Sequence, residues 1–222
     1  MTQIEWFGQS TFRLTGDGAP TVVIDPYDAA AIGARRRWDY PALDGLTADL
    51  LLVTHEHADH NGVGAIGGDP AVVRSLAGTF ETPHGTVVGV ASEHDDAAGT
   101  QRGHNVMYVF DFGGLRVAHL GDLGQAGLRD EQRAALGVVD VLFVPVGGGP
   151  TIGAEAAAMV ARELGARVVV PMHFRTERID FLEPVDGFMA ASSYGVRLDA
   201  SSFVVEEMWE AERPVVVVPA AP

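Results

Sequence analysis

The segment from Leu51 to His60 constrains this chain more than any other, because an apolar run leads directly into a dense group of metal-binding side chains. It reads Leu-Leu-Val-Thr-His-Glu-His-Ala-Asp-His, with three histidines and two carboxylates within six residues. Side chains alternate along a strand, so His55 and His57 point to the same side. A turn into a helix near Asp59 would bring this carboxylate and His60 to the same place. Imidazole and carboxylate bind zinc, manganese and iron, and the segment therefore predicts a metal site at a strand end.

Two other interpretations of this segment are weaker. A solvated loop that holds three histidines by chance does not explain the strongly apolar strand before it. The helical zinc-protease motif His-Glu-x-x-His needs a histidine four residues after the first, and the residue four after His55 is Asp59.

The amino-acid composition excludes several kinds of catalytic and metal site. The chain has no cysteine, which excludes disulfides, a thiol nucleophile and cysteine-held zinc or iron–sulfur sites. Its formal net charge of −15 argues against nucleic acid as a partner, because binding a phosphate backbone relies on Lys and Arg. The one basic run, Arg35–Arg37, is too short to reverse the negative electrostatic potential that this charge creates. No Gly-x-Ser-x-Gly occurs, so nothing indicates a serine nucleophile.

The 222 residues show no internal repeat and no linker, so we expect one domain over residues 1–222. No apolar run approaches the roughly 20 residues that span a bilayer. The first residues lack the basic and apolar regions of a signal peptide, so we expect a cytoplasmic protein without a membrane partner. The oligomeric state stays open, a homo-oligomer included.

Short apolar runs stopped by Gly, Pro or Asp predict the secondary structure. Strands are expected at Ile4–Phe7, Thr11–Leu14, Val22–Asp25, Leu50–Thr54, Val87–Ala91, Met107–Phe112, Leu115–Leu120, Val139–Val144, Val168–Val170 and Val215–Val218. Helices are expected at Leu128–Leu136, Ala154–Leu164 and Pro184–Ser192. Strands followed by β-α-β units favour sheets covered by helices.

The pattern His-x-His-x-Asp-His is complete here and resembles the signature of the metallo-β-lactamase superfamily. Later strand ends match the family too, in Ala91-Ser92-Glu93-His94-Asp95, His119-Leu120-Gly121-Asp122 and Val170-Pro171-Met172-His173. Within the superfamily the chain is similar to the branch of ascorbate-6-phosphate lactonase-like proteins, through Gly8-Gln9-Ser10-Thr11-Phe12, Ile24-Asp25-Pro26, Arg102-Gly103-His104-Asn105 and Pro145-Val146-Gly147-Gly148. Gly153 departs from that pattern, which has an acidic residue there.

The resemblance implies an α/β fold, a four-layer αββα sandwich with the metals at one edge. It also implies one or two divalent ions, with zinc preferred and manganese, iron or nickel as alternatives. One ion would be held by His55, His57 and His94, and the other by Asp59, His60 and His173. Asp122 would bridge the two ions.

The function expected from these residues is hydrolysis of a small ester, lactone or similar substrate by a metal-activated water, with Asp59 and Asp122 as catalytic residues. Asp59 would orient the water and accept its proton, as the family's carboxylate does. One alternative is a phosphodiesterase acting on a small phosphorylated metabolite. Another is a non-hydrolytic di-metal redox or sensor protein, ranked last because this site is rich in histidine. The substrate and the metal are not fixed by the sequence.

The remaining candidates carry two interpretations each. His119 is either an outer partner of the metal site or a core histidine, and His104 is either a substrate contact or a loop residue. Asp25 either orients a metal-binding histidine or caps a turn. Arg35–Arg37, Arg102 and Arg175 either recruit an anionic substrate or are solvated. We expect His84 to lie in an exposed turn, and Glu56 to face solvent or pair locally.

Overall fold

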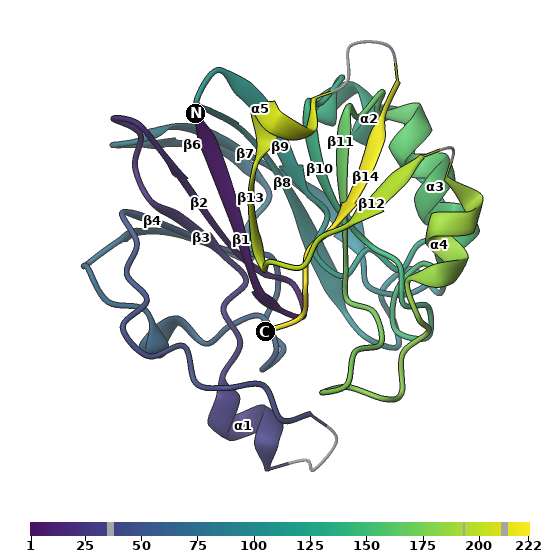
Figure 1. The fold of residues 1–222 in the computed structure, drawn as a ribbon, viewed down its shortest axis with the longest axis horizontal. Helices are drawn as coiled ribbons and strands as arrows, with labels where there is room; N and C mark the ends of the chain where they lie inside the picture. The colour runs from purple at the N-terminus through teal and green to yellow at the C-terminus, as the bar shows by residue number, and fades with distance from the viewer. Residues whose placement is uncertain (35–37, 193, 210–212) are drawn as a thin grey trace.

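Figure 1 shows the protein in a computed structural model, which describes residues 1–34, 38–192, 194–209 and 213–222. The arginine run at 35–37 lies outside the described residues. Two β-sheets pack face to face, and most of the buried apolar side chains lie between them or under the helices. Among the described residues, no helix is long and apolar enough to cross a membrane.

The first sheet has six strands in the order β13-β1-β2-β3-β4-β5. Their bounds are β1 (Thr2–Gly8), β2 (Thr11–Gly16), β3 (Val22–Ile24), β4 (Leu50–Val53), β5 (Ala71–Arg74) and β13 (Ser202–Val204). Strands β1 to β3 are antiparallel, whereas β3, β4 and β5 run parallel. Strand β4 is apolar throughout because both of its faces are buried: Leu50 and Leu52 join the main core, and Leu51 and Val53 join a second cluster on the opposite face.

The second sheet has eight strands in the order β12-β14-β11-β10-β9-β8-β7-β6. Their bounds are β6 (Gly78–Thr82), β7 (Gly85–Glu93), β8 (His104–Phe112), β9 (Leu115–His119), β10 (Val141–Pro145), β11 (Val168–Met172), β12 (Gly195–Arg197) and β14 (Val215–Val218). The strands from β6 to β9 form an antiparallel meander. Gly113 and Gly114 close its last hairpin, both with positive φ, as a tight turn between twisted strands requires.

Helices α2 (Asp130–Leu136), α3 (Ala154–Glu163) and α4 (Asp186–Ala191) lie on the outer face of the eight-stranded sheet. The outer face of the other sheet is covered by the connection around the short helix α1 (Ala29–Gly33), which contributes Tyr27, Ile32 and Tyr40 to the second cluster. The two remaining elements are the short helices η1 (Val63–Ala65), between β4 and β5, and α5 (Val205–Met208), between β13 and β14. The expected αββα sandwich is therefore confirmed, with a thin outer layer on the six-stranded side.

This topology gathers several polar loops at one edge of the sandwich. Strand β4 of the first sheet leads into His55, and β7, β9 and β11 of the second sheet lead into the loops that carry His94, Asp122 and His173. All the strands and helices expected from the sequence are present, so the segments that carry the candidate ligands lie where they were expected.

Candidate metal centre

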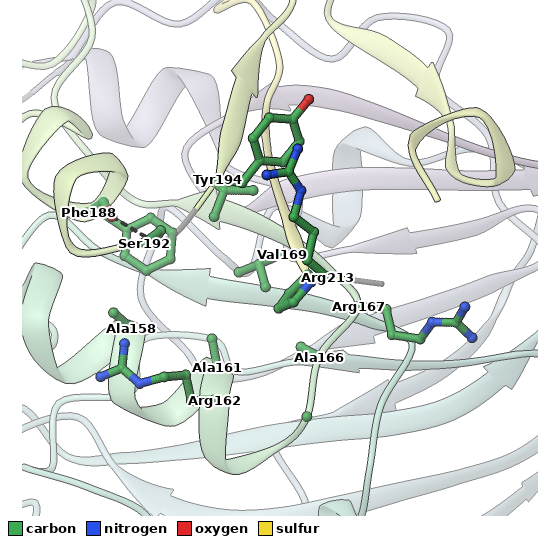
Figure 2. Close-up of a pocket in the computed structure, with 13 residues that line it drawn as sticks. Ala158, Ala161, Arg162, Ala166, Arg167, Val169, Phe188, Ser192, Tyr194 and Arg213 are labelled. Atoms are coloured by element: carbon green, nitrogen blue, oxygen red, sulfur yellow. Dashed lines mark hydrogen bonds between the residues drawn. The ribbon is translucent and has the colours of Figure 1, made fainter. Parts of the chain in front are cut away.

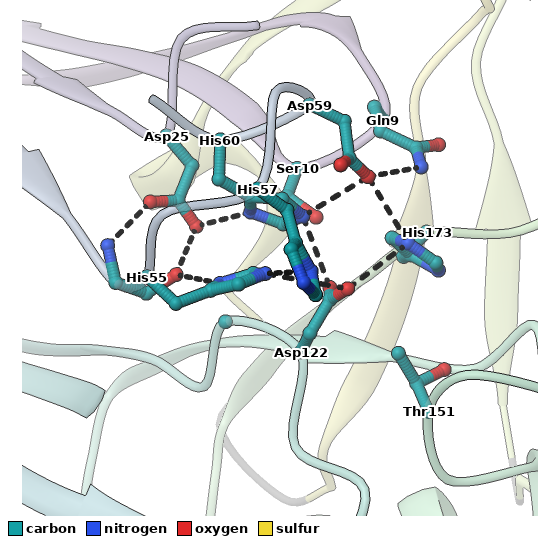
Figure 3. Close-up of polar contacts among 12 residues, drawn as sticks. Gln9, Ser10, Asp25, His55, His57, Asp59, His60, Asp122, Thr151 and His173 are labelled. Atoms are coloured by element: carbon teal, nitrogen blue, oxygen red, sulfur yellow. Dashed lines mark hydrogen bonds and ion pairs between the residues drawn. The ribbon is translucent and has the colours of Figure 1, made fainter. Parts of the chain in front are cut away.

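The structure brings all the predicted metal ligands together at this edge, in two adjacent groups (Figure 3). The first group consists of His55, His57 and His94, and the second of Asp59, His60, Asp122 and His173. Within each group the ligand atoms lie within 4.8 Å of one another. The two groups contain the two sets of three ligands that the resemblance implies, and Asp122, the implied bridge, falls in the second group.

In the first group, three imidazole nitrogens converge from two sheets. His57 Nδ1 lies 3.1 Å from His55 Nε2 and 3.2 Å from His94 Nε2. Ligand atoms about 2.0–2.1 Å from a tetrahedral zinc ion are about 3.4 Å apart. The spacing therefore suits three ligands of one ion.

The second group contains two histidines and two carboxylates, and three of its members, Asp59, His60 and His173, would hold the second ion. Asp59 Oδ2 lies 3.3 Å from His60 Nε2 and 3.6 Å from His173 Nε2. His60 and His173 are almost completely buried, at 0% and 2% exposure. This spacing also suits a metal ion that is bound by one oxygen and two nitrogens.

The carboxylate of Asp122 faces both groups. Its Oδ1 lies 3.2 Å from His60 Nε2, and its Oδ2 lies 3.1 Å from His94 Nε2 and 3.3 Å from His173 Nε2. One carboxylate between two sets of nitrogens is the arrangement of a bridging ligand.

Buried atoms at this site also indicate that a cation belongs there. His60 Nε2 and Asp122 Oδ1 are buried and make no hydrogen bond of good geometry among the described residues, although they lie 3.2 Å from each other. A buried polar atom without a partner costs about 1–3 kcal/mol. A divalent ion would satisfy both atoms, and the donor set of imidazole and carboxylate fits zinc, manganese or iron.

The charges of these side chains depend strongly on one another. Burial and the neighbouring His60 lower the pKa of His55 well below its usual value. Burial works in the same direction on His60, but the charges of Asp122 and Asp59 outweigh it and raise the pKa of His60 well above the usual range. For His173, burial is likewise outweighed by Asp122 and Asp59, and its pKa rises to about 9. The neighbouring carboxylates therefore favour the protonated forms of His60 and His173 when no metal is bound.

The two carboxylates of this site, Asp59 and Asp122, have lowered pKa values for the converse reason. Burial favours their protonated forms, but the charge of His60 overcomes it at Asp59 and those of His173 and His60 at Asp122, so both pKa values fall well below the usual range. Metal ions and protons would therefore compete for these imidazoles.

Hydrogen bonds behind the ligands fix the direction of their rings. His60 Nδ1 donates to Asp25 Oδ2 at 2.8 Å, which leaves Nε2 for the site. Asp25 Oδ1 accepts from the backbone N–H of Thr54 at 2.7 Å, so the same carboxylate connects β3 with the end of β4. His94 Nδ1 donates to the carbonyl oxygen of Pro150 at 3.0 Å. Of the two interpretations of Asp25, this geometry favours the one in which it orients a histidine of the site.

Known proteins resemble the chain over most of its length. Residues 3–173 match the model of the β-lactamase superfamily domain. A metal-dependent hydrolase of Nitratidesulfovibrio vulgaris is 30% identical over 202 residues, which cover 79% of this chain and 81% of the relative. One from Thermus thermophilus is 29% identical and covers 79% and 85%. A solved structure from Thermotoga maritima, described as a zinc-dependent hydrolase of the metallo-β-lactamase superfamily, is 34% identical, covers 98% of both chains and has a TM-score of 0.77.

The chain belongs to the metallo-β-lactamase superfamily. It is a metal-dependent hydrolase with a histidine and aspartate cluster able to bind metal ions. The isothiocyanate hydrolase of Delia radicum gut bacteria, at 17% identity with a TM-score of 0.65 and 98% of this chain covered, shares the fold.

Two amides support this superfamily site and were not assigned from the sequence. Gln9 Nε2 donates to Asp59 Oδ2 at 3.2 Å, and Asn105 Oδ1 accepts from the backbone N–H of Asp122 at 3.0 Å. Gln9 has φ of 52°, a left-handed backbone that is uncommon for residues other than glycine. The only sequence signal was that both amides lie in segments through which the chain resembles lactonase-like proteins.

The other candidate residues take the roles that their surroundings allow. His119 is buried, and its Nε2 donates to the carbonyl oxygen of Ser10 at 3.1 Å, so it ties β9 to the β1–β2 turn. His84 is exposed in a turn, as expected. Glu56 pairs with Arg74, whose hydrogen bonds lower the pKa of Glu56 to about 2. His104 is exposed at the start of β8 and does not line the cleft described next.

The metal-binding groups lie at the floor of a cleft of about 300 Å³, which is lined by Trp38, His57, Asp59, His94, Arg102, Asp122, Pro150, His173 and Phe181. Arg175 is not among these residues, because its Nε donates to the carbonyl oxygen of Leu182 at 2.6 Å. Of the two interpretations of Arg175, its position outside the cleft lining does not favour contact with an anionic substrate there. A different hollow, of about 410 Å³, lies between α3, α4 and β14 (Figure 2). Among the described residues, no histidine or carboxylate lines it.

Proposed function

We propose that this metal-dependent hydrolase cleaves a small ester, lactone or similar acyl substrate with a metal-activated water. The observation that carries the proposal is Asp122, whose two oxygens face two groups of ligands at the floor of an open cleft. A cleft of about 300 Å³ suits a small molecule.

Each side chain at the floor has a role in this proposal. His55, His57 and His94 would hold one ion, Asp59, His60 and His173 the other, and Asp122 would join them. When bound, such ions lower the pKa of water from about 15.7 to about 7 and polarise the oxygen that gains charge. Asp59, held in place by Gln9, would orient the attacking water and accept its proton at a carboxylate oxygen. We prefer zinc as the metal, because three nitrogens at the observed spacing suit its tetrahedral coordination.

A second candidate is cleavage of a small phosphodiester. The same ligands serve this reaction, and the cationic side chain of Arg102 at the cleft favours an anionic substrate. The names of the relatives at about 30% identity favour hydrolysis over the redox and sensor alternatives.

The proposal is tested by screening lactones, aryl esters and phosphodiesters with the zinc-reconstituted protein. We expect turnover of an acyl substrate, and the same preparation of Asp122→Ala should be inactive. Turnover confined to phosphodiesters would replace the first candidate with the second. Acyl hydrolysis that survives in Asp122→Ala would show that the activity does not arise at this centre.

A further inference from the structure

The cleft above the metal centre combines one cation with two aromatic side chains. Arg102, Trp38 and Phe181 line it together with the candidate ligands. The rings of Trp38 and Phe181 lie 5.4 Å apart at an angle of 55° and form one wall. The cleft therefore offers three kinds of contact to a substrate: metal ions at the floor, an apolar wall and a guanidinium.

A buried carboxylate beside a candidate ligand shapes the loop that carries Arg102. Asp95 is 6% exposed and follows His94 directly. Its oxygens accept hydrogen bonds from four backbone N–H groups, those of Ala97, Gly99, Gln101 and Arg102, at 2.7–3.0 Å. The loop thus closes on Asp95, which sets the backbone of Arg102 relative to the metal centre.

The side chain of Arg102 differs in its contacts from those of Arg175 and Arg178, which are held by hydrogen bonds to the backbone. Arg175 Nε donates to the carbonyl oxygen of Leu182, and Arg178 Nε donates to the carbonyl oxygen of Pro222 at 2.6 Å. Both side chains therefore connect separate segments of the backbone. The Arg102 guanidinium has no hydrogen-bond or ion-pair partner in the described part of the chain, and its side chain is exposed. Among the described residues, Arg102 is also the only Lys or Arg that lines this cleft.

The excess of acidic residues in the chain bears on why Arg102 lies at the cleft. The protein carries 15 basic residues against 30 acidic ones, and most of the described arginines form an ion pair with a carboxylate. Two divalent ions at the floor would leave the centre positive, because the carboxylates of Asp59, Asp122 and Asp25 offset only three of their four charges. Arginine presents a planar fork that matches carboxylate and phosphate oxygens.

We propose that Arg102 selects substrates with a second, remote anionic group, a carboxylate or phosphate, joined to the scissile acyl group by a short apolar spacer that packs on Trp38 and Phe181. This inference deepens the proposed acyl hydrolysis and rests on it. Arg102 is a specificity-determining residue in this scheme and takes no part in bond cleavage.

A binding experiment tests the inference without any turnover. Glutarate and valerate have the same carbon chain, but glutarate carries a carboxylate at each end. We expect zinc-loaded wild-type protein to bind glutarate about tenfold more tightly than valerate, as measured by isothermal titration calorimetry. That preference should disappear in Arg102→Met, remain in part in Arg102→Lys, and be unchanged in Arg197→Met. Arg197 is a matched control, because it pairs with Asp186 away from the cleft.

Phosphonobutyrate, in which a phosphonate replaces one carboxylate, separates the two sources of negative charge. A larger loss for this compound than for glutarate in Arg102→Met identifies phosphate-bearing substrates, and a larger loss for glutarate identifies dicarboxylates. A preference for the anionic compounds that is the same in wild type and Arg102→Met would overturn the inference. An absent preference in the wild type would overturn it as well.

A kinetic experiment connects this binding to the proposed reaction. Hydrolysis of mono-para-nitrophenyl glutarate adds water across the acyl–oxygen bond and gives glutarate and para-nitrophenol. Arg102→Met should raise KM for this ester about tenfold with little change in kcat, because a remote group binds ground state and transition state alike. Turnover of para-nitrophenyl valerate should be unchanged. Equal losses for both esters would refute the role of Arg102. If the wild type hydrolyses no ester, acyl hydrolysis itself fails, and the binding experiment alone decides on Arg102.

Discussion

Asp122 is the residue on which the two-ion interpretation depends most, because its oxygens face nitrogens of both ligand groups at 3.1–3.3 Å. We predict that Asp122→Ala loses more activity than the roughly 10–100-fold that follows from removing an outer partner of a ligand. Zinc content by elemental analysis should fall from two ions to one or fewer, while the circular dichroism spectrum is retained. His84→Ala is the control, since His84 lies in an exposed turn, and equal losses in both variants would contradict the assignment.

A substitution of Asp25 tests whether the residues behind the candidate ligands affect the zinc affinity of the site. Its carboxylate accepts from His60 Nδ1 and Thr54 N, and its backbone has φ of 48°. Asp25→Asn keeps the shape but removes the charge that fixes the imidazole, so we predict a 10–100-fold loss of zinc affinity, typical of such partners. Competition with a chromophoric chelator measures this affinity. An unchanged zinc affinity would mean that the hydrogen bond is only structural.

The residues of the candidate metal site were predictable from the sequence, whereas the residues that support them were not. Histidine and aspartate in His-x-His-x-Asp-His carry their chemistry in their side chains, so the pattern of residues by itself indicates a metal centre. Gln9 and Asn105 act only through hydrogen bonds across the fold, from β1–β2 and β8. An amide at such positions has no chemical signature, and only the packed sheets show what it contacts.

At the scale of elements, sequence analysis predicted most strands but not all of them. The strands that sequence analysis missed, β5, β6, β12 and β13, are the four edge strands of the two sheets. Edge strands are only partly buried, so their apolar pattern is weak: β6 reads Gly-Thr-Phe-Glu-Thr and has no fully buried residue. Central strands such as β10 and β11 are buried throughout and read as continuous apolar runs.

The loop after β10 positions the last ligand by close backbone contact. A Cβ atom on Gly147 would lie 2.1 Å from the carbonyl oxygen of His173. We predict that Gly147→Ala displaces the His173 loop, destabilises the protein by about 1–3 kcal/mol and weakens zinc binding, although no ligand is removed. Urea unfolding and zinc titration measure the two effects. Gly64→Ala is the control, because nothing lies within 4 Å of its Cβ position. Normal zinc affinity in Gly147→Ala would show that the loop adapts without cost to the site.

At the scale of the whole molecule, the metal centre joins the two sheets. His55, His57, Asp59 and His60 follow β4 of the six-stranded sheet, whereas His94, Asp122 and His173 follow strands of the eight-stranded sheet. Each ligand group therefore draws side chains from both sheets. Metal bound to the folded protein must stabilise it, since no such group exists in an unfolded chain.

This linkage leads to a prediction for metal removal. Zinc at about a thousand times its Kd adds about 4 kcal/mol to the free energy of unfolding, which for a chain of this size corresponds to roughly 8–16 °C in Tm. We predict that chelation lowers the Tm by about this amount in calorimetry, and that zinc restores it. Because both sheets share one core and one metal centre, we also propose that residues 1–222 form one domain, which unfolds in one transition with or without metal. Asp122→Ala should show a smaller zinc-dependent shift than wild type. Two separate transitions would contradict the single domain, and a Tm that does not respond to zinc would contradict the connection between the sheets.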